Sequence, residues 1–314
     1  MKKIMITGSC GFILGNFVRK AIYDQKKQSD RYSFVSVDRV NTNAQNSMYW
    51  NLNHKFYPAD IRDQHVIDII FQFEQPDIVI HGAEENDILS DNNSLISSNI
   101  SGTQVIINAC IKYKVNKLVY LSTSKVYGEL LKETDPSWTE KSIINPKGIY
   151  AASKAAAELL IMSTSNLNYN IVRSCNNYGP RQSSSKLIPK TIKSILENKK
   201  MSLYGQGQHL REWMYVADHC SALMSIIEKG ENNQIYNVST NYEFSNLEVV
   251  NEVFRAMGSE TADFVEFIPN NLSIFRSSIN SDKIRNIGWK PSYKFKDGIK
   301  ENVKWFLDNR WFLK

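Results

Sequence analysis

The chain has 314 residues, 42% of them hydrophobic and 22% charged, a balance that excludes disordered, collagen-like and coiled-coil classes. Its net charge of +6 is spread along the chain and does not predict nucleic-acid binding, and no apolar run is long enough for a transmembrane helix. The cysteines Cys10, Cys110, Cys175 and Cys220 lack the spacing of a zinc site or of a disulfide framework. We therefore expect a globular protein of the reducing cytoplasm.

Short apolar runs alternate with segments of helical periodicity through the first part of the chain. The predicted strands cover residues 2–7, 33–37, 77–81, 117–122 and 170–173. The predicted helices between them include residues 12–22, 63–73 and 95–113. Strands that alternate with helices indicate crossover units, and therefore a doubly wound, Rossmann-like parallel sheet with helices on both faces.

The composition changes after residue 174, where clusters of Asn, Ser, Gly and Pro begin. Short strands are predicted near 201–204 and 213–216, with later helices at 246–257 and 296–308. We expect a sheet domain of residues 1–174 plus about 212–240. A smaller, partly discontinuous substrate-binding domain would then comprise about 175–211 and 241–314, with a cleft between the two.

The first motif that indicates chemistry follows the first predicted strand. Gly8 and Gly11 allow a tight turn and let backbone N–H groups at a helix N-terminus approach a pyrophosphate. Asp38 ends the next strand, where its carboxylate can accept hydrogen bonds from an adenosine ribose. The combination predicts dinucleotide binding, with NAD favoured over NADP because Asp38 would repel a 2′-phosphate. Arg39 weakens that preference.

The second motif is Tyr150 and Lys154, four residues apart on a predicted helix. Residues at this spacing share a helix face, so the Lys154 ammonium can lower the pKa of Tyr150 from its ordinary value of about 10. The resulting phenolate could take a proton from a sugar hydroxyl while a nicotinamide takes the hydride. Alone, such a pair more often reflects packing and a solvated charge. Its position after the strand that leads to Thr123, in a nucleotide-binding fold, favours catalysis.

With these motifs in place, the chain resembles the extended short-chain dehydrogenase/reductases that modify nucleotide sugars, and especially the dTDP-glucose 4,6-dehydratase branch. The resemblance extends over nearly the whole chain. Its motifs are residues 7–13 (TGSCGFI), 59–62 (ADIR), 81–85 (HGAEE), 122–128 (STSKVYG), 150–154 (YAASK), 176–180 (NNYGP), 186–189 (KLIP), 211–218 (REWMYVAD) and 287–291 (IGWKP).

The resemblance implies a role for particular residues. The expected NAD-binding residues are Gly8, Gly11, Phe12, Ile13, Asp38, Asp60, Ile61, Ala83, Tyr150 and Lys154. The expected catalytic residues are Thr123, Tyr150 and Lys154, with Ser124 and Lys125 beside them. The expected substrate-binding residues are Glu85, Asn177, Lys186, Leu187, Leu203, Tyr204, Arg211 and Arg276. The implied substrate is a nucleotide-diphosphate sugar, and the implied partner is a second copy of the chain, bound through helices 95–113 and 150–166.

Two departures from the family pattern matter. Leu14 stands where the family has its third glycine, so the first helix is expected slightly further from the first strand. Lys125 stands where the dehydratase branch has the glutamate that removes the C5 proton, and Ser124 replaces the aspartate that protonates the departing C6 hydroxyl. An ammonium has no free lone pair near neutral pH unless it is strongly desolvated. We interpret Lys125 as a solvated side chain, a partner of Glu84 or Glu85, or a ligand for a substrate carboxylate.

The function expected from the sequence is NAD-dependent oxidation of a nucleotide sugar at C4, by a 4-epimerase or a 4-dehydrogenase. One alternative is a 4,6-dehydratase whose base is another carboxylate, with Glu84, Glu85, Asp87 and Glu129 as candidates. An alternative of a different class is a non-catalytic, nucleotide-binding regulatory protein. The retained Tyr150 and Lys154 argue against that last hypothesis.

Overall fold

The structure is a computed structural model that describes residues 1–25 (backbone only at 22–25), 31–39, 54–86, 91–259, 264–269 and 275–313. Its largest element is a seven-stranded sheet in which all neighbouring strands are parallel. The order across the sheet is β10 (Gln234–Val238), β6 (Tyr169–Ser174), β5 (Lys117–Thr123), β4 (Ile78–His81), β1 (Lys2–Thr7), β2 (Tyr32–Asp38) and β3 (His54–Pro58). The predicted Rossmann-like fold is confirmed.

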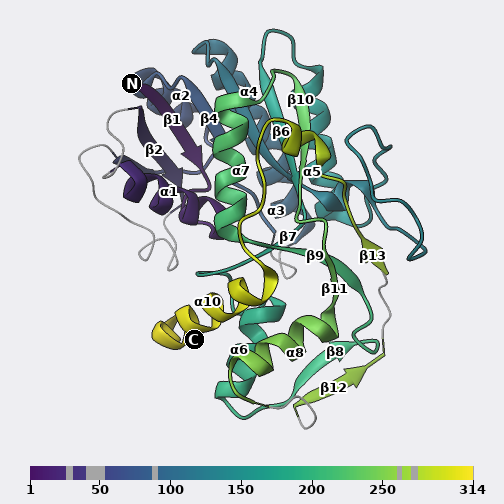
Figure 1. Cartoon of the computed structure of the whole chain (residues 1–314). Coiled ribbons are helices and arrows are strands. Elements are labelled where there is room, and N and C mark those ends of the chain that lie inside the picture. The colour runs from purple at the N-terminus through teal and green to yellow at the C-terminus, as the bar shows by residue number, and fades with distance from the viewer. Residues whose placement is uncertain (26–30, 40–53, 87–90, 260–263, 270–274, 314) are drawn as a thin grey trace.

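Helices cover both faces of this sheet (Figure 1). One face carries α1 (Phe12–Gln25) and α7 (Val216–Lys229), and the other carries α2 (Gln64–Glu74), α4 (Thr103–Lys112) and α5 (Ile149–Ser163). Side chains alternate between faces along a strand, so Ile4 and Ile6 of β1 join the first apolar cluster and Met5 joins the second. Burial on both faces explains why the central strands are continuous apolar runs.

Several elements of the sheet domain differ from the sequence prediction, and among them β10 and α7 were not predicted. Strand β3 was not predicted, because its sequence HKFYP is largely polar and only His54 is buried at this edge of the sheet. The predicted helix 95–113 consists of α3 (Asn92–Ile96), a π-helical turn (Ser97–Gly102) and α4. The Asp91 side chain accepts hydrogen bonds from two backbone N–H groups and so caps α3. Helix formation therefore begins before residue 95.

The lower half of the molecule in Figure 1 is built mainly from the chain after residue 174. Its strands are β7 (Asn176–Tyr178), β8 (Met201–Tyr204), β9 (Leu210–Tyr215), β11 (Glu243–Ser245), β12 (Val265–Ile268) and β13 (Arg276–Ser277). Its helices include α6 (Leu187–Leu196), α8 (Asn246–Ala256) and α10 (Phe295–Asp308), and α9 (Asp282–Asn286) lies against β10 of the large sheet. Strand β9 pairs with β7, β11 and β13, and β8 pairs with β12.

The lower half has an apolar core of its own. Ile188 and Ile192 of α6 pack with Val253 of α8 and Phe306 of α10. The sequence between β9 and β11 forms α7 and β10, which belong to the large sheet, so the chain returns to the upper half before it completes the lower one. This crossing brings residues far apart in sequence to one cavity between the halves.

Among the described residues, no helix is long and apolar enough to span a membrane. The four cysteines are free thiols, and the part of the chain that the structure describes has no cluster of metal-ligating side chains. The absence of a disulfide framework and of a zinc site stays a prediction, made from the spacing of the cysteines in the sequence.

Candidate active site

A cavity of about 740 Å³ lies at the carboxyl ends of the parallel strands and extends into the lower half. Crevices at this edge of a doubly wound sheet are where such folds bind their ligands. The predicted site residues that line it are Gly8, Gly11, Phe12, Ile13, Asp38, Asp60, Ile61, Ala83, Thr123, Lys125, Tyr150, Asn177, Lys186, Leu187, Leu203, Tyr204 and Arg211. Ser124, Lys154, Glu85 and Arg276 do not line it, and Asp87 lies outside the described residues.

The glycine turn forms the end of the cavity beside β1. Gly8 has a φ of 78°, and a Cβ at this residue would lie 2.5 Å from the backbone nitrogen of Ala83, so no other residue type fits there. Helix α1 begins at Phe12, and the first N–H groups of a helix have no partner within it. A bare backbone turn that leads into a helix N-terminus fits the pyrophosphate of a dinucleotide.

Leu14, which stands where the family has its third glycine, packs against the sheet side of the glycine turn. Its buried side chain fills the space above Gly82, where a Cβ would lie 2.5 Å from Leu14 Cδ1. The turn keeps a close hydrogen bond from Gly15 N to Gly11 O at 2.9 Å. Residue 82 has no side chain, and this leaves the space that the leucine at residue 14 fills.

Asp38 lies at the end of β2 on the same side of the cavity. Its carboxylate accepts hydrogen bonds from the backbone N–H groups of Cys10 and Arg39, each at 2.7 Å. Burial raises the pKa of Asp38, and these hydrogen bonds partly oppose that increase. Arg39 also forms an ion pair with Glu85 at 3.6 Å. A carboxylate held at this position is suited to accept hydrogen bonds from a ribose.

Tyr150 and Lys154 share one face of α5, as predicted, but a carboxylate that the sequence did not place there joins them. Glu84, just beyond β4, accepts a hydrogen bond from Tyr150 Oη at 3.1 Å and forms an ion pair with Lys154 Nζ at 2.7 Å. Lys154 Nζ also donates to the carbonyl of Leu121 at 2.7 Å and lies 4.3 Å from the centre of the Tyr120 ring. Glu84 therefore bridges the two predicted catalytic side chains.

The pKa of Tyr150 shifts in the direction opposite to the one expected from the sequence. Burial and the negative charge of Glu84 raise the pKa of Tyr150 well above its ordinary value, whereas the sequence predicted that Lys154 would lower it. Burial alone would lower the pKa of Lys154, but Glu84 more than compensates and raises it. In this arrangement Tyr150 is a neutral phenol and Lys154 an ammonium.

Lys125 follows Thr123 at the end of β5, in a 3-10 turn (Ser124–Tyr127). Thr123 lines the cavity, and its hydroxyl accepts a hydrogen bond from the backbone N–H of Lys125 at 3.2 Å. The Lys125 ammonium lies 5.4 Å from the centre of the Tyr150 ring. No described carboxylate forms an ion pair with Lys125, because Glu84 pairs with Lys154 and Glu85 with Arg39. Lys125 therefore faces the cavity instead of pairing with the expected acids.

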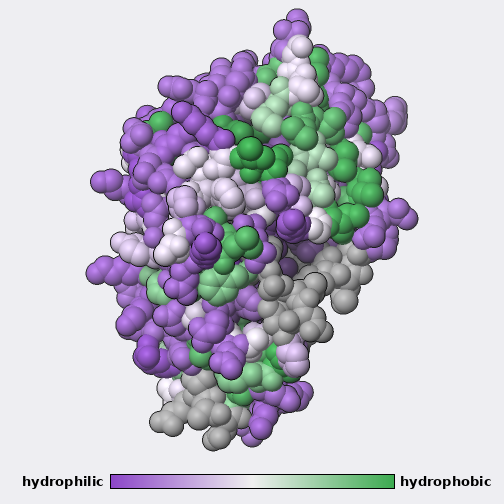
Figure 2. Space-filling view, turned by 90° about the vertical axis from the view of Figure 1, so that its right-hand side faces the viewer, coloured by the Kyte–Doolittle hydropathy of each residue, from purple (hydrophilic) through white to green (hydrophobic). Residues whose placement is uncertain are grey.

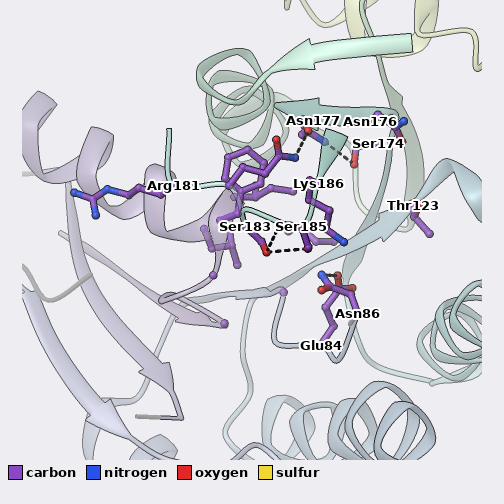
Figure 3. A pocket seen from close by; sticks show the side chains of 18 of the residues that line it. Glu84, Asn86, Thr123, Ser174, Asn176, Asn177, Arg181, Ser183, Ser185 and Lys186 are labelled. Atoms are coloured by element: carbon purple, nitrogen blue, oxygen red, sulfur yellow. Dashed lines mark hydrogen bonds between the residues drawn. The ribbon is translucent and has the colours of Figure 1, made fainter. Parts of the chain in front are cut away.

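The wall of the cavity that is formed by the chain after residue 174 carries six of the eight predicted substrate residues, of which Figure 3 labels Asn177 and Lys186. Lys186 precedes α6, and the Asn177 side chain is held by hydrogen bonds to the Cys175 carbonyl (2.9 Å) and to His219 (3.1 Å). Arg276 is placed differently: its guanidinium donates two hydrogen bonds to Glu243, at 2.5 and 2.6 Å, away from the cavity. The family resemblance assigned Arg276 to the substrate, but nothing in the sequence indicated that Glu243 would pair with it.

Three cationic residues that line the cavity, Arg19, Lys190 and Arg181, were not named from the sequence, and Glu84 was given no special weight. Lys190 lies one helical turn after Lys186 and lines the same wall, so the i, i+4 spacing was a usable signal. Arg181 also lines the cavity, and Figure 3 shows its side chain extending away from the other labelled residues. Glu84 was only one of four alternative carboxylates. Glu129, another of those four, accepts a hydrogen bond from the backbone of Phe275 and does not line the cavity.

Comparison with known proteins places this site in a family. The model of the NAD dependent epimerase/dehydratase family matches residues 4–239. The low-salt glycan biosynthesis protein Agl12 of Haloferax volcanii is 33% identical over 315 residues, covering 97% of this chain and 98% of the relative. The chain therefore belongs to the NAD dependent epimerase/dehydratase family of extended short-chain dehydrogenase/reductases, and it is an NAD-dependent oxidoreductase-type enzyme.

Solved structures with related chemistry have the same fold. A dTDP-glucose 4,6-dehydratase of Bacillus anthracis in complex with NAD has a TM-score of 0.89 at 30% identity, covering 99% of this chain and 98% of that one. A UDP-glucose 4-epimerase of Thermus thermophilus in complex with NAD has a TM-score of 0.87 at 26% identity, covering 97% and 99%. Because both reaction types occur among these neighbours, the fold leaves the reaction to be argued from the site.

Proposed function

We propose that this protein oxidises a nucleotide-diphosphate sugar at C4 and then acts as a 4-epimerase or releases the 4-keto sugar as a 4-dehydrogenase. The observation that carries this proposal is Lys125, whose ammonium occupies the cavity beside Tyr150. In the dehydratase branch that the chain resembles, the corresponding residue is the glutamate that removes the C5 proton. A protonated ammonium cannot take that proton, so oxidation at C4 would not be followed by loss of water.

The site residues support a simple path for the O4 proton. NAD, when bound, accepts the hydride from C4. Tyr150 Oη receives the proton of the sugar hydroxyl and passes its own proton to Glu84, with which it already shares a hydrogen bond. Thr123, at the end of β5, offers a hydroxyl to the same sugar oxygen. Lys154 stays protonated and balances the negative charge that moves among these oxygens.

A second reaction has one specific observation in its favour. Glu84 is a carboxylate that lines the cavity within hydrogen-bond distance of Tyr150, so it is the described acid best placed to serve as a relocated C5 base. The protein would then be a 4,6-dehydratase, like the B. anthracis neighbour. We favour the first reaction because, in the path above, Glu84 holds the proton of Tyr150 once C4 is oxidised, so it has no free lone pair for the C5 proton until it releases that one.

The products decide between the two reactions. We expect the NAD-loaded enzyme, incubated with UDP-glucose or dTDP-glucose in deuterated water, to form products that keep the C6 oxygen and gain no deuterium at C5. Mass spectrometry and proton NMR measure both. A 4-keto-6-deoxy product with solvent deuterium at C5 and C6 would overturn the proposal and support Glu84 as the base, which Glu84→Gln should then abolish.

We also propose that the enzyme is a homodimer. The helices predicted to form its interface carry exposed apolar side chains, among them Ile96 (43% exposed), Ile111 (42%) and Leu159 (54%). Figure 2 shows apolar side chains gathered on the upper half of the face that lies to the right in Figure 1. Sedimentation equilibrium should give twice the chain mass, and Leu159→Glu should shift it toward the monomer. A monomeric wild-type protein would contradict this.

A further inference from the structure

The cavity has an uneven distribution of charge. Its described lining carboxylates are Asp38 and Asp60, near the glycine turn, and Glu84, at the junction with Tyr150. From Thr123 into the lower half, the described lining has no carboxylate. It has instead five cationic side chains, namely Lys125, Arg181, Lys186, Lys190 and Arg211, of which Arg181 extends away from the other residues labelled in Figure 3 and lies 5.4 Å from the centre of the Trp305 ring. The substrate half of the cavity is therefore built for an anion.

Lys125 differs from the other four cations in its position. Lys186 and Lys190 belong to the start of α6, and Arg211 belongs to β9, all in the lower half. Lys125 lies on the sheet side, two residues after Thr123, with its ammonium 5.4 Å from the centre of the Tyr150 ring. Cations in the lower half suit the diphosphate, whereas Lys125 lies where the reacting sugar must be placed.

The surroundings of Lys125 leave its charge uncompensated within the described protein. The Lys125 side chain is exposed, but partial desolvation and the positive charges of Lys186 and Arg211 still lower its pKa, and Glu84 offsets this only in part. Glu84 itself is already paired with Lys154 at 2.7 Å. A cation held among other cations is unfavourable until an anion binds. The natural source of that anion is the ligand.

We propose that the substrate sugar carries a carboxylate on C5, as in a hexuronate, and that Lys125 binds this carboxylate. This inference depends on the proposed oxidation at C4. In a hexuronate the carboxylate is attached to the ring carbon next to C4, so a sugar with O4 at Tyr150 brings it to the neighbouring Lys125. A hexuronate also has no C6 hydroxyl to eliminate, which accounts for a lysine where a dehydratase needs a base.

The proposal predicts a charge-dependent binding preference. Calorimetric titration of the NAD-loaded enzyme should show that UDP-glucuronate binds at least about tenfold more tightly than UDP-glucose, and the dTDP pair tests the other nucleotide. Lys125→Met should remove about ten- to a hundredfold of uronate affinity, as expected for a charge-assisted hydrogen bond, and should leave the glucose compound unchanged. Lys125→Arg should retain the preference.

Lys186→Met is the matched control. Loss of a side chain that binds the diphosphate should weaken the binding of the uronate and of the glucose compound equally. The inference is overturned if wild-type enzyme shows no preference for the uronate, or if Lys125→Met weakens both sugars alike, since Lys125 would then bind phosphate. Its failure is distinguishable from failure of the proposed function. C4 oxidation of glucose compounds without a uronate preference overturns the inference alone, whereas a 4-keto-6-deoxy product overturns the proposed function.

Discussion

Two buried ionic clusters lie along one face of α5, at successive turns, and differ in their access to the cavity. Tyr150 and Lys154 meet Glu84, whose side chain is 20% exposed and lines the cavity. One turn further, Glu158 pairs with Arg173, and the two side chains are 0% and 3% exposed. Glu158 accepts hydrogen bonds from Arg173 Nε (3.1 Å) and Nη2 (2.5 Å), and another from Ser122.

The difference separates a structural role from a functional one. The inner cluster consists of Glu158, Arg173 and Ser122. Its ion pair is a fork of parallel hydrogen bonds whose two charged side chains do not line the cavity, and the cluster joins α5 to β6 and β5. The outer cluster consists of Tyr150, Lys154 and Glu84. It also pairs a carboxylate with a cation, but its phenol and its carboxylate face the cavity. Tyr150 and Glu84 can therefore give up their mutual hydrogen bond for one with a ligand. Loss of the inner cluster should affect folding, and loss of the outer cluster should affect turnover.

The largest expected effect is that of Tyr150→Phe on turnover. Removal of the phenolic oxygen should reduce the rate of C4 oxidation about 10²- to 10⁴-fold, because the O4 proton loses its acceptor. NAD affinity and urea denaturation should stay close to wild type. Tyr242→Phe, at an exposed residue, is the control. Retained oxidation in Tyr150→Phe would exclude this residue as the proton acceptor.

Substitutions in the inner cluster should lower the free energy of unfolding. Arg173→Met leaves Glu158 buried without its partner, so the free energy of unfolding should fall by about 3–5 kcal/mol in a urea titration. Adding Glu158→Leu should recover much of the loss. Arg255→Met, which breaks an ion pair of Glu252 with an arginine side chain that is 67% exposed, should cost less than about 1 kcal/mol. Equal losses in the two single variants would contradict the distinction between buried and exposed pairs.

The smallest of these effects concerns pH. Glu84 raises the pKa of Tyr150, so Glu84→Gln should lower it and leave Lys154 to favour the phenolate. The variant has no carboxylate to take the Tyr150 proton, so its oxidation depends on the phenolate, which forms only as the pH approaches that pKa. The pH dependence of single-turnover oxidation should therefore move to higher pH. Glu85→Gln, next in sequence but paired with Arg39, should leave the profile in place. An unchanged profile, or a move to lower pH, would contradict the role of Glu84 as the acceptor of the Tyr150 proton.

Local sequence patterns were sufficient for the five inner strands of the sheet, but not for its edge strands β3 and β10 or for the contacts that decide the chemistry. The apolar runs and the glycine turn predicted the central strands and the position of Asp38, because these depend on neighbours in sequence. The bridge from Glu84 to Lys154 depends on how closely the end of β4 approaches α5, a distance that no local pattern encodes. The pairing of Arg276 with Glu243 likewise joins strands that are distant in sequence. The spacing of Tyr150 and Lys154 predicted their shared face but not the charge placed between them.

Because Leu14 contacts Gly82, the residue tolerated at either position should depend on the residue at the other. A side chain added at residue 82 would collide with Leu14 Cδ1 at 2.5 Å, whereas removal of bulk at residue 14 would leave a void over Gly82. Neither change is neutral by itself, so the two positions should drift only as a pair. An alignment of relatives should therefore show side-chain volume at these positions varying inversely. The exchange of Leu14→Gly with Gly82→Leu should be better tolerated than the sum of its single substitutions.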